Sequence, residues 1–217
     1  MVTIVRLLTE LTLTDLASLR AALRKLHDIY HVPNVVISSI PLTKLSASIP
    51  SYILPPVESS SSIHDEKSYL ICIASSVDEN DNSNEGPLST VYAGCVEFIP
   101  GYFTGVGDLF SALLLGHFHT PQSDSSDHAK AFPPLALAAS HSLSKTHGIL
   151  TLTHESASTL DLPLSDDELD ACEPGRKNKR MKGRELMIVE GQDVYRRKEW
   201  NGVTRMTLWK EFWNEQN

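Results

Sequence analysis

The sequence predicts an α/β fold with a mostly parallel central sheet, in a chain of 217 residues that is long enough for one domain and short for two. Short apolar runs rich in β-branched residues occur at residues 34–39, 69–74 and 89–99, and each fits a strand buried on both faces. Other segments have helical patterns, and strands separated by helices are typical of a parallel sheet. We therefore expect an α/β domain built around one sheet.

The first helix is predicted over residues 14–30 from an amphipathic pattern. Apolar residues recur there at steps of three and four, which places them on one face: Leu16, Leu19, Leu23, Leu26 and Tyr30. Thr14 is the expected N-cap, because its hydroxyl can accept a hydrogen bond from a free N–H group of the first turn. Pro33 stops the helix and begins the extended run that follows.

Two more helices are predicted later in the chain, over residues 105–117 and 135–147, with a polar loop at residues 121–134 between them. Residues 185–189, with the sequence ELMIV, predict a last strand. The tail, residues 195–217, carries all three tryptophans. The spacing of its apolar residues predicts a short helix that covers apolar surface.

The composition argues against several classes of function. A formal net charge of −8 opposes binding to nucleic acid and to an anionic membrane surface, so neither is an expected partner. No apolar stretch reaches the roughly 20 residues that a transmembrane helix needs, and Glu10 argues against a signal peptide. Cys72, Cys95 and Cys172 suggest neither a metal site nor a disulfide framework. A cytoplasmic location is therefore expected.

A basic run at residues 176–184 follows an acidic stretch at residues 166–173. Such a run can be a nuclear-localisation signal or a nucleic-acid patch, and it could also contact ATP phosphates as a flap. The acidic stretch offsets its charge, so a solvated loop is our main interpretation. A nuclear location remains an alternative to the cytoplasmic one.

His117 and His119 form an HxH pair, with His128 nearby, which is part of a metal-ligand pattern. A zinc site needs a third ligand at workable geometry, and no cysteine or carboxylate motif accompanies the pair. We interpret these histidines as helix-end and loop residues, and the sequence names no metal ligand.

The most informative segment is the loop Gly105-Val106-Gly107-Asp108, which follows a predicted strand and opens a predicted helix. Two glycines let the backbone approach a phosphate, and the free N–H groups of a helix N-terminus favour an anion. An acidic residue here would repel that phosphate unless it takes a proton from an attacking hydroxyl. The loop thus predicts phosphoryl transfer with Asp108 as the base. A tight turn in which Asp108 only caps the helix fits the same spacing.

Residues 105–115, GVGDLFSALLL, resemble the GTGDLF-type signature of pyridoxal kinases in the ribokinase-like superfamily. Residues 31–39 resemble the family's strand that ends in adjacent hydroxyl residues near the nucleotide, and residues 184–192 resemble its last core strand. The order and spacing of these blocks agree over residues 13–189. The resemblance implies a three-layer ribokinase-like domain with a mostly parallel central sheet, a single partial domain over residues 1–217.

The resemblance also assigns roles to the residues of the loop. Asp108 matches the base that deprotonates the 5′-hydroxyl of pyridoxal, and Gly105, Val106 and Gly107 match the anion hole for the transferred γ-phosphate. The implied activity is ATP-dependent phosphorylation of pyridoxal, pyridoxine or pyridoxamine in vitamin B6 salvage, with formation of pyridoxal 5′-phosphate.

The nucleotide would lie against two further segments. Ser38 and Ser39 match residues near the ATP phosphates, and the helix at residues 135–147 would flank the adenine end. Such kinases use ATP with Mg²⁺, often with a monovalent cation such as K⁺. They are commonly homodimers, so a homodimer is an expected assembly.

Two features depart from the family pattern. Val106 stands where the family usually has threonine, and the lost hydroxyl would cost about 1 kcal/mol or more if it bonds to phosphate. Family members begin with a long region that supplies the first strands and most pyridoxal contacts, whereas residues 1–10 lack the Thr-Pro-Asn-x-x-Glu motif. We therefore expect a sheet that is incomplete at the N-terminus, with residues 1–10 at the broken edge of a domain.

Other functions fit the same residues. A noncatalytic fragment that binds nucleotide, or a subunit that pairs with a full-length kinase, would fit the missing N-terminal region. A ribokinase-like kinase for sugars or for hydroxymethylpyrimidine would fit the loop, although residues 109–112 and 31–39 favour the pyridoxal branch.

Overall fold

The computed structural model describes residues 2–45, 48–54, 68–77, 87–101, 103–119, 132–160, 162, 167–196 and 205–214. Along the chain, the elements are α1 (Val2–Thr9), α2 (Leu16–Arg24), the π-helical segment η1 (Lys25–Ile29), β1 (Asn34–Pro41), the 3₁₀ turn η2 (Leu42–Lys44), β2 (Tyr69–Ser76), β3 (Thr90–Glu97), α3 (Val106–His117), α4 (Pro134–Ser158), α5 (Asp167–Cys172), α6 (Pro174–Lys182), α7 (Gln192–Arg196) and β4 (Thr207–Leu208).

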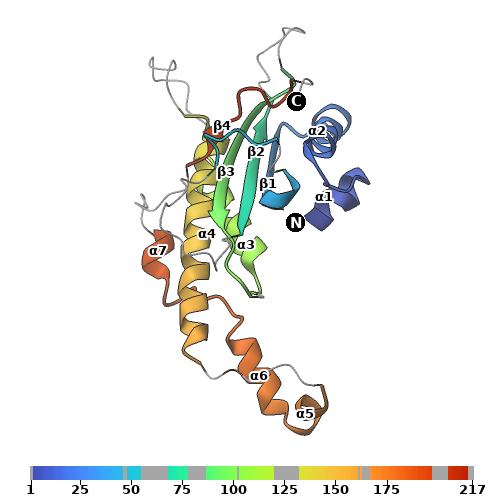
Figure 1. Ribbon diagram of the computed structural model, residues 1–217. Helices are drawn as coiled ribbons and strands as arrows, with labels where there is room; N and C mark the ends of the chain where they lie inside the picture. Colours follow the sequence, from blue (N-terminus) through green and yellow to red (C-terminus); the bar gives the residue numbers. More distant parts are fainter. Residues whose placement is uncertain are drawn as a thin grey trace.

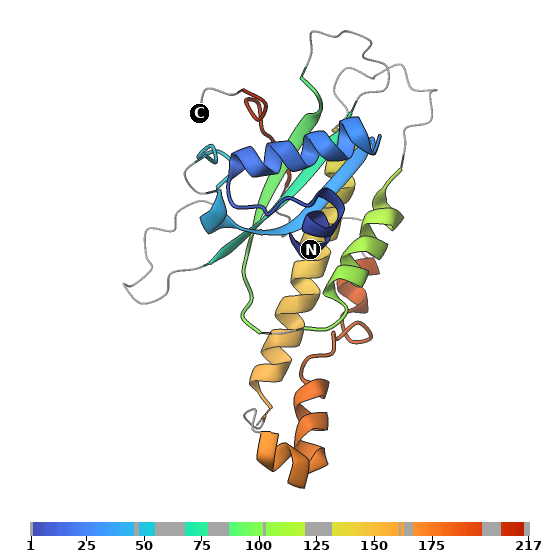
Figure 2. The ribbon, with the colours of Figure 1, turned by 90° about the vertical axis from the view of Figure 1, so that its right-hand side faces the viewer.

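The described elements form three layers, with the sheet in the middle (Figure 1). Helices α1 and α2 cover one face, and α3 and α4 cover the other, where they run side by side (Figure 2). Strand β2 shows how the sheet separates two cores. Ile71 and Ile73 belong to the core under α2, whereas Cys72 and Ala74 belong to the core under α3 and α4. The prediction of strands buried on both faces is confirmed.

The prediction of a mostly parallel sheet is wrong for the described strands. They pair in the order β1-β2-β3-β4, and every neighbouring pair is antiparallel. The parallel pairing that the structure describes is an isolated bridge between Thr104 and Glu185. Apolar runs report that both faces of a strand are covered, and helices can cover an antiparallel sheet as well as a parallel one. The runs therefore carry no information on strand direction.

The first long helix begins one residue later than predicted. Asp15, and not Thr14, is the N-cap: its carboxylate accepts from the Ser18 N–H at 2.8 Å, and the Ser18 hydroxyl accepts from the Asp15 N–H at 3.0 Å. The backbone hydrogen bond from Ser18 lowers the pKa of Asp15. This reciprocal pair is a capping box, which satisfies two N–H groups at once. The predicted helix then ends as the π-helical segment η1.

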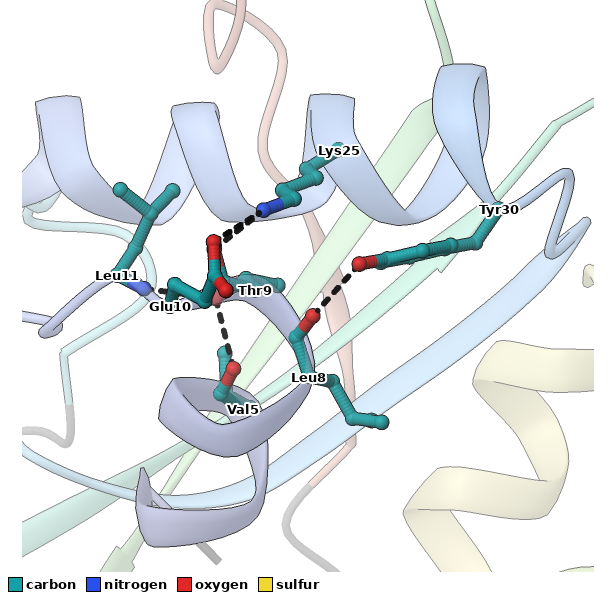
Figure 3. Close-up of polar contacts among 7 residues, drawn as sticks. All are labelled: Val5, Leu8, Thr9, Glu10, Leu11, Lys25 and Tyr30. Atoms are coloured by element: carbon teal, nitrogen blue, oxygen red, sulfur yellow. Dashed lines mark hydrogen bonds and ion pairs between the residues drawn. The ribbon is translucent and has the colours of Figure 1, made fainter.

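Residues 2–9, part of the segment expected at a broken edge, form α1, and polar contacts join its C-terminal end to η1 and to Tyr30, which follows η1 (Figure 3). The Lys25 Nζ donates to Thr9 O at 2.9 Å and lies 3.3 Å from Glu10 Oε2. The Tyr30 hydroxyl donates to Leu8 O at 2.9 Å. These contacts satisfy carbonyl groups that the C-terminus of a helix leaves without a partner.

Two predicted elements of the C-terminal part are wrong. Residues 185–189 do not form a strand: Glu185 makes an isolated bridge, residues 186–187 are irregular, and residues 188–189 form a turn. Of the tail, Tyr195 and Arg196 end α7 (Gln192–Arg196), residues 205–214 form β4 and turns in place of the predicted helix, and the other residues lie outside the described part of the chain. Trp209 and Phe212 are nevertheless buried in the core under α2, so the tail covers apolar surface as predicted. Isolated apolar residues over a few positions do not distinguish a helix from a strand or turn.

Two helical regions extend beyond their predictions. Helix α4 has 25 residues and passes through Gly148, because Ile149 and Thr153 beyond it are buried. The basic run lies in α6 rather than in a loop, and it is joined to α5 by ion pairs from Arg176 and Arg180 to Asp170. None of the described helices has both the length and the apolar character that a membrane crossing requires.

Candidate active site

The N-terminus of α3 is open to a ligand. Gly105 precedes the helix with φ of 81°, a left-handed conformation that favours glycine. No described side chain caps the helix, and the first N–H groups of a helix have no acceptor inside it. The N–H groups at the start of α3 can therefore bind an anion such as a phosphate.

A segment far along the chain positions this loop. Thr104, which precedes Gly105, donates to Arg184 O from its N–H at 3.0 Å and from its hydroxyl at 3.3 Å. It also forms the parallel bridge with Glu185. The residues that follow α6 thus hold the start of the loop in place.

A β-bulge brings the two predicted serines to the same place. The register of β1 against β2 shifts between Ile37 and Ile40. Adjacent residues of a regular strand point to opposite faces, whereas a bulge redirects a side chain. The Ser38 and Ser39 hydroxyl oxygens lie 3.3 Å apart as a result.

The bulge and the start of α3 meet at a cavity of about 340 Å³. Four predicted site residues line it: Ser38, Ser39, Val106 and Gly107. Most of the remaining wall is apolar, formed by Leu70, Val96, Phe98, Ile99, Phe103, Phe110, Leu143 and Leu150. A polar end beside apolar walls suits a ligand that joins an anion to a flat hydrophobic ring.

Helix α4, whose predicted role was to flank an adenine ring, forms one wall of this cavity. Its lining residues are Leu143, Thr146, His147 and Leu150. They follow the i, i+3, i+4, i+7 spacing of one helix face, although the spacing alone does not say that this face borders a cavity. His147 Nε2 lies 3.2 Å from Glu97 O, and since a carbonyl only accepts, this nitrogen carries the proton.

Gly105 and Asp108 do not line the cavity. Gly105 lies beneath Leu186, and Asp108 is an exposed residue of the first turn of α3. Gly107, which lines the cavity, directly precedes Asp108 in the sequence. A Cβ atom at Gly107 would meet no atom within 4 Å. The open space at Gly107 leaves room for a ligand next to the Asp108 side of the loop.

Comparisons with known proteins found proteins that are similar to this chain. The chain is 30% identical to the "Putative pyridoxal kinase BUD16" of Saccharomyces cerevisiae over 154 residues, which are 71% of this chain and 41% of the yeast protein. A pyridoxal kinase from Leishmania donovani in complex with ADP and pyridoxine aligns with a TM-score of 0.56 at 19% identity, and its complex with ADP and pyridoxamine aligns at 0.55. The chain has a pyridoxal-kinase-like fold. No protein-family model matches it.

The chain corresponds to only part of a pyridoxal kinase. The residues aligned with the Leishmania donovani kinase make up 95% of this chain and 48% of that kinase, and the chain also spans less than half of the yeast relative. The similarity to these kinases in three dimensions is thus a similarity of fold over less than half of their length.

The described residues contain no group of three His, Cys, Asp or Glu that could hold a metal ion. His117 lies 2.9 Å from Lys145 Nζ and stacks on His141 at 4.9 Å. Burial and the neighbouring Lys145 lower the pKa of His117 to about 4. His119 is exposed, and His128 lies outside the described residues. The described part of the chain thus offers no protein cage for Mg²⁺, which often binds mainly through nucleotide phosphates.

Proposed function

We propose that this chain acts in the ATP-dependent phosphorylation of the 5′-hydroxyl of pyridoxal, pyridoxine or pyridoxamine, in vitamin B6 salvage. The observation that carries the proposal is the cavity at which the bulge of β1 meets the open N-terminus of α3. The similarity to pyridoxal kinases supports the same conclusion, since some of the similar structures hold ADP with a B6 vitamer.

In this proposal the nucleotide occupies the cavity. The N–H groups at Val106 and Gly107 bind the γ-phosphate and stabilise its charge during transfer. The hydroxyls of Ser38 and Ser39 donate to the neighbouring phosphates. The apolar walls hold the base. Mg²⁺, with a monovalent cation such as K⁺, would accompany the phosphates.

The vitamer binds on the Asp108 side of the loop. Asp108 takes the proton of the 5′-hydroxyl as its oxygen forms a bond to the γ-phosphorus, and the bond to the bridging β,γ-oxygen breaks to release ADP. An exposed first-turn carboxylate can swing toward a substrate without displacing a packed neighbour. Val106 keeps the shape of the threonine that the family usually has at this position but lacks its hydroxyl donor.

A second function follows from the position of Asp108. Its side chain is not among the residues that line the cavity. This observation favours a nucleotide-binding subunit that pairs with a full-length kinase, or with a second copy of this chain, and is not active alone. A cytoplasmic location is proposed for either function.

The deciding experiment measures ATP-dependent phosphorylation of pyridoxal by the purified chain, beside Asp108→Asn. The matched control is Asp193→Asn, which also removes an acidic side chain from the first turn of a helix, far along the chain from the loop. We expect Asp108→Asn to lower turnover at least 100-fold, because general-base catalysis typically contributes that much. Asp193→Asn should keep the wild-type rate.

The same preparations distinguish the two functions. A folded chain that binds ATP but gives no turnover would exclude the autonomous kinase and support the subunit. Equal turnover in wild type and Asp108→Asn would remove Asp108 from the mechanism. A folded chain that binds no ATP would exclude both functions.

A further inference from the structure

Thr146 is a polar residue in the wall of the cavity whose hydroxyl has no partner among the described residues. Its side chain is only 5% exposed, and its oxygen is shielded from solvent. A buried hydroxyl without a hydrogen bond destabilises a protein, so native structures rarely keep one without a reason.

Other hydroxyls of α4 behave differently. Six of them donate to the carbonyl four residues earlier at 2.7 to 3.0 Å: Ser140, Ser142, Ser144, Thr151, Thr153 and Ser158. This is the usual local partner for a hydroxyl inside a helix. Thr146 is the α4 hydroxyl that both lines the cavity and lacks this bond.

We propose that the Thr146 hydroxyl recognises the base of the bound nucleotide, an inference that rests on the proposed function. Threonine in a helix has two accessible rotamers, so its hydroxyl can turn toward an occupant of the cavity. A hydroxyl donates one hydrogen bond and accepts others, which suits a ring nitrogen beside an exocyclic amino group of a purine.

The position of Thr146 favours the base over the phosphates. Its neighbours along the same wall are Leu143, Leu150 and His147, whose Nε2 is held by Glu97 O, whereas the N–H groups that suit phosphate lie at the start of α3. A triphosphate next to leucine side chains would lose its hydration without compensation. A flat ring loses little there, and one well-placed polar group fixes its orientation.

The test compares Thr146→Val, which keeps the shape and removes the hydroxyl, with Thr146→Ser, which keeps the hydroxyl. Calorimetry measures binding of ATP, of inorganic tripolyphosphate and of pyridoxal to each protein. We expect Thr146→Val to weaken ATP binding about 5- to 10-fold, the value of one ordinary hydrogen bond, and Thr146→Ser to change it by less than about 2-fold. Binding of tripolyphosphate should be equal in all three proteins.

A thermal melt of the ligand-free proteins adds a second readout. Thr146→Val should melt at or above the wild-type temperature, because it replaces an unpaired buried hydroxyl by a methyl group. Thr153→Val on the same helix is the contrast. Its hydroxyl donates to Ile149 O and accepts from the Met187 N–H, so this variant should melt lower than wild type.

Several outcomes would overturn the inference. If Thr146→Val binds ATP as tightly as wild type, the hydroxyl does not contact the base, and the proposed function is unaffected. Equal losses for ATP and tripolyphosphate would assign Thr146 to the phosphates. A loss for pyridoxal alone would place the vitamer in the cavity. If wild type binds no ATP, the proposed function fails together with the inference.

Discussion

At the scale of single residues, a substitution at Gly107 should affect the stability of the fold and the binding of phosphate differently. A methyl group at Gly107 has open space around it and a backbone conformation that any residue can adopt. That space belongs to the cavity at the proposed phosphate site. Stability and function therefore respond in opposite directions to a change at this residue.

The variant Gly107→Ala tests this directly. Alanine should raise the free energy of unfolding by up to about 1 kcal/mol, because it is the better helix former. It should lower ATP affinity at least about 10-fold, because its methyl group prevents close approach of the phosphate to the backbone. Chemical denaturation and calorimetry measure the two effects.

Gly116→Ala is the matched control, since Gly116 lies in the same helix, does not line the cavity, and would place a methyl group where no atom lies within 4 Å. It should stabilise the chain similarly and leave ATP binding unchanged. An unaltered ATP affinity in Gly107→Ala would mean that the phosphates do not lie against the start of α3.

At the scale of elements, the α5–α6 hairpin depends on one carboxylate. Asp170 receives hydrogen bonds from Arg180 and lies 3.5 Å from the Arg176 Nε, and the bonds from Arg180 lower the pKa of Asp170. The hairpin extends beyond the sheet, at the end of α4 (Figures 1 and 2). Its two helices are short, so their stability comes from contact with each other.

We expect Asp170→Ala to speed amide hydrogen exchange throughout α5 and α6, while the strands keep their wild-type protection. Hydrogen exchange followed by mass spectrometry resolves the two regions. Glu173→Ala removes an exposed carboxylate between the same helices and should leave exchange unchanged. Equal protection of α6 in wild type and Asp170→Ala would show that the hairpin does not need this ion pair.

The elements also show what the sequence could and could not predict. The apolar runs at 34–39 and 69–74 are strands, because burial on both faces leaves a continuous apolar signature. Whether two strands pair in parallel or antiparallel is a property of the pair and cannot be read from the sequence of either strand. The bulge at Ser38 and Ser39 is likewise a property of the pairing of β1 with β2. Alternation alone would have separated the two hydroxyls.

The candidate site was predicted in a similar, partial way. Gly105 and Gly107 are conspicuous because a helix begins between them, so the loop could be located from local chemistry. Thr146 and His147 were missed because an alternation of apolar and polar residues along a helix does not say which face borders a cavity. The missing hydrogen bond of Thr146 becomes evident only when its neighbours are in place.

At the scale of the whole molecule, stability should fall in mild acid because of two histidines, the buried His27 and the half-buried His117. His27 is 6% exposed, with Nδ1 at 2.6 Å from Val32 O and Nε2 at 2.8 Å from Ser75 Oγ. Burial lowers the pKa of His27 below its ordinary value of 6.5, and the pKa of His117 falls to about 4. The unfolded chain therefore takes up protons below pH 6.5 that the folded chain does not.

The free energy of unfolding should accordingly decrease as the pH falls from about 6.5 toward about 4, by at most about 1.4 kcal/mol per pH unit for each of these histidines. Urea unfolding at a series of pH values measures this slope. His27→Gln should reduce the slope, because it removes a histidine whose pKa burial lowers. A slope that His27→Gln leaves unchanged would assign the acid sensitivity to other groups.

The two hydrogen bonds from Thr104 to Arg184 O mean that the site depends on a residue outside the predicted binding groups. The serines of the bulge, the glycine loop and the wall of α4 all precede residue 160. Yet the start of the glycine loop is held by the carbonyl of Arg184, which lies more than 20 residues beyond residue 160 in the sequence. During synthesis, once the first 160 residues have left the ribosome, every binding group has emerged, but the phosphate loop still lacks its hydrogen bonds to Arg184 O. Competence to bind nucleotide should therefore appear late in translation, after α6 has emerged.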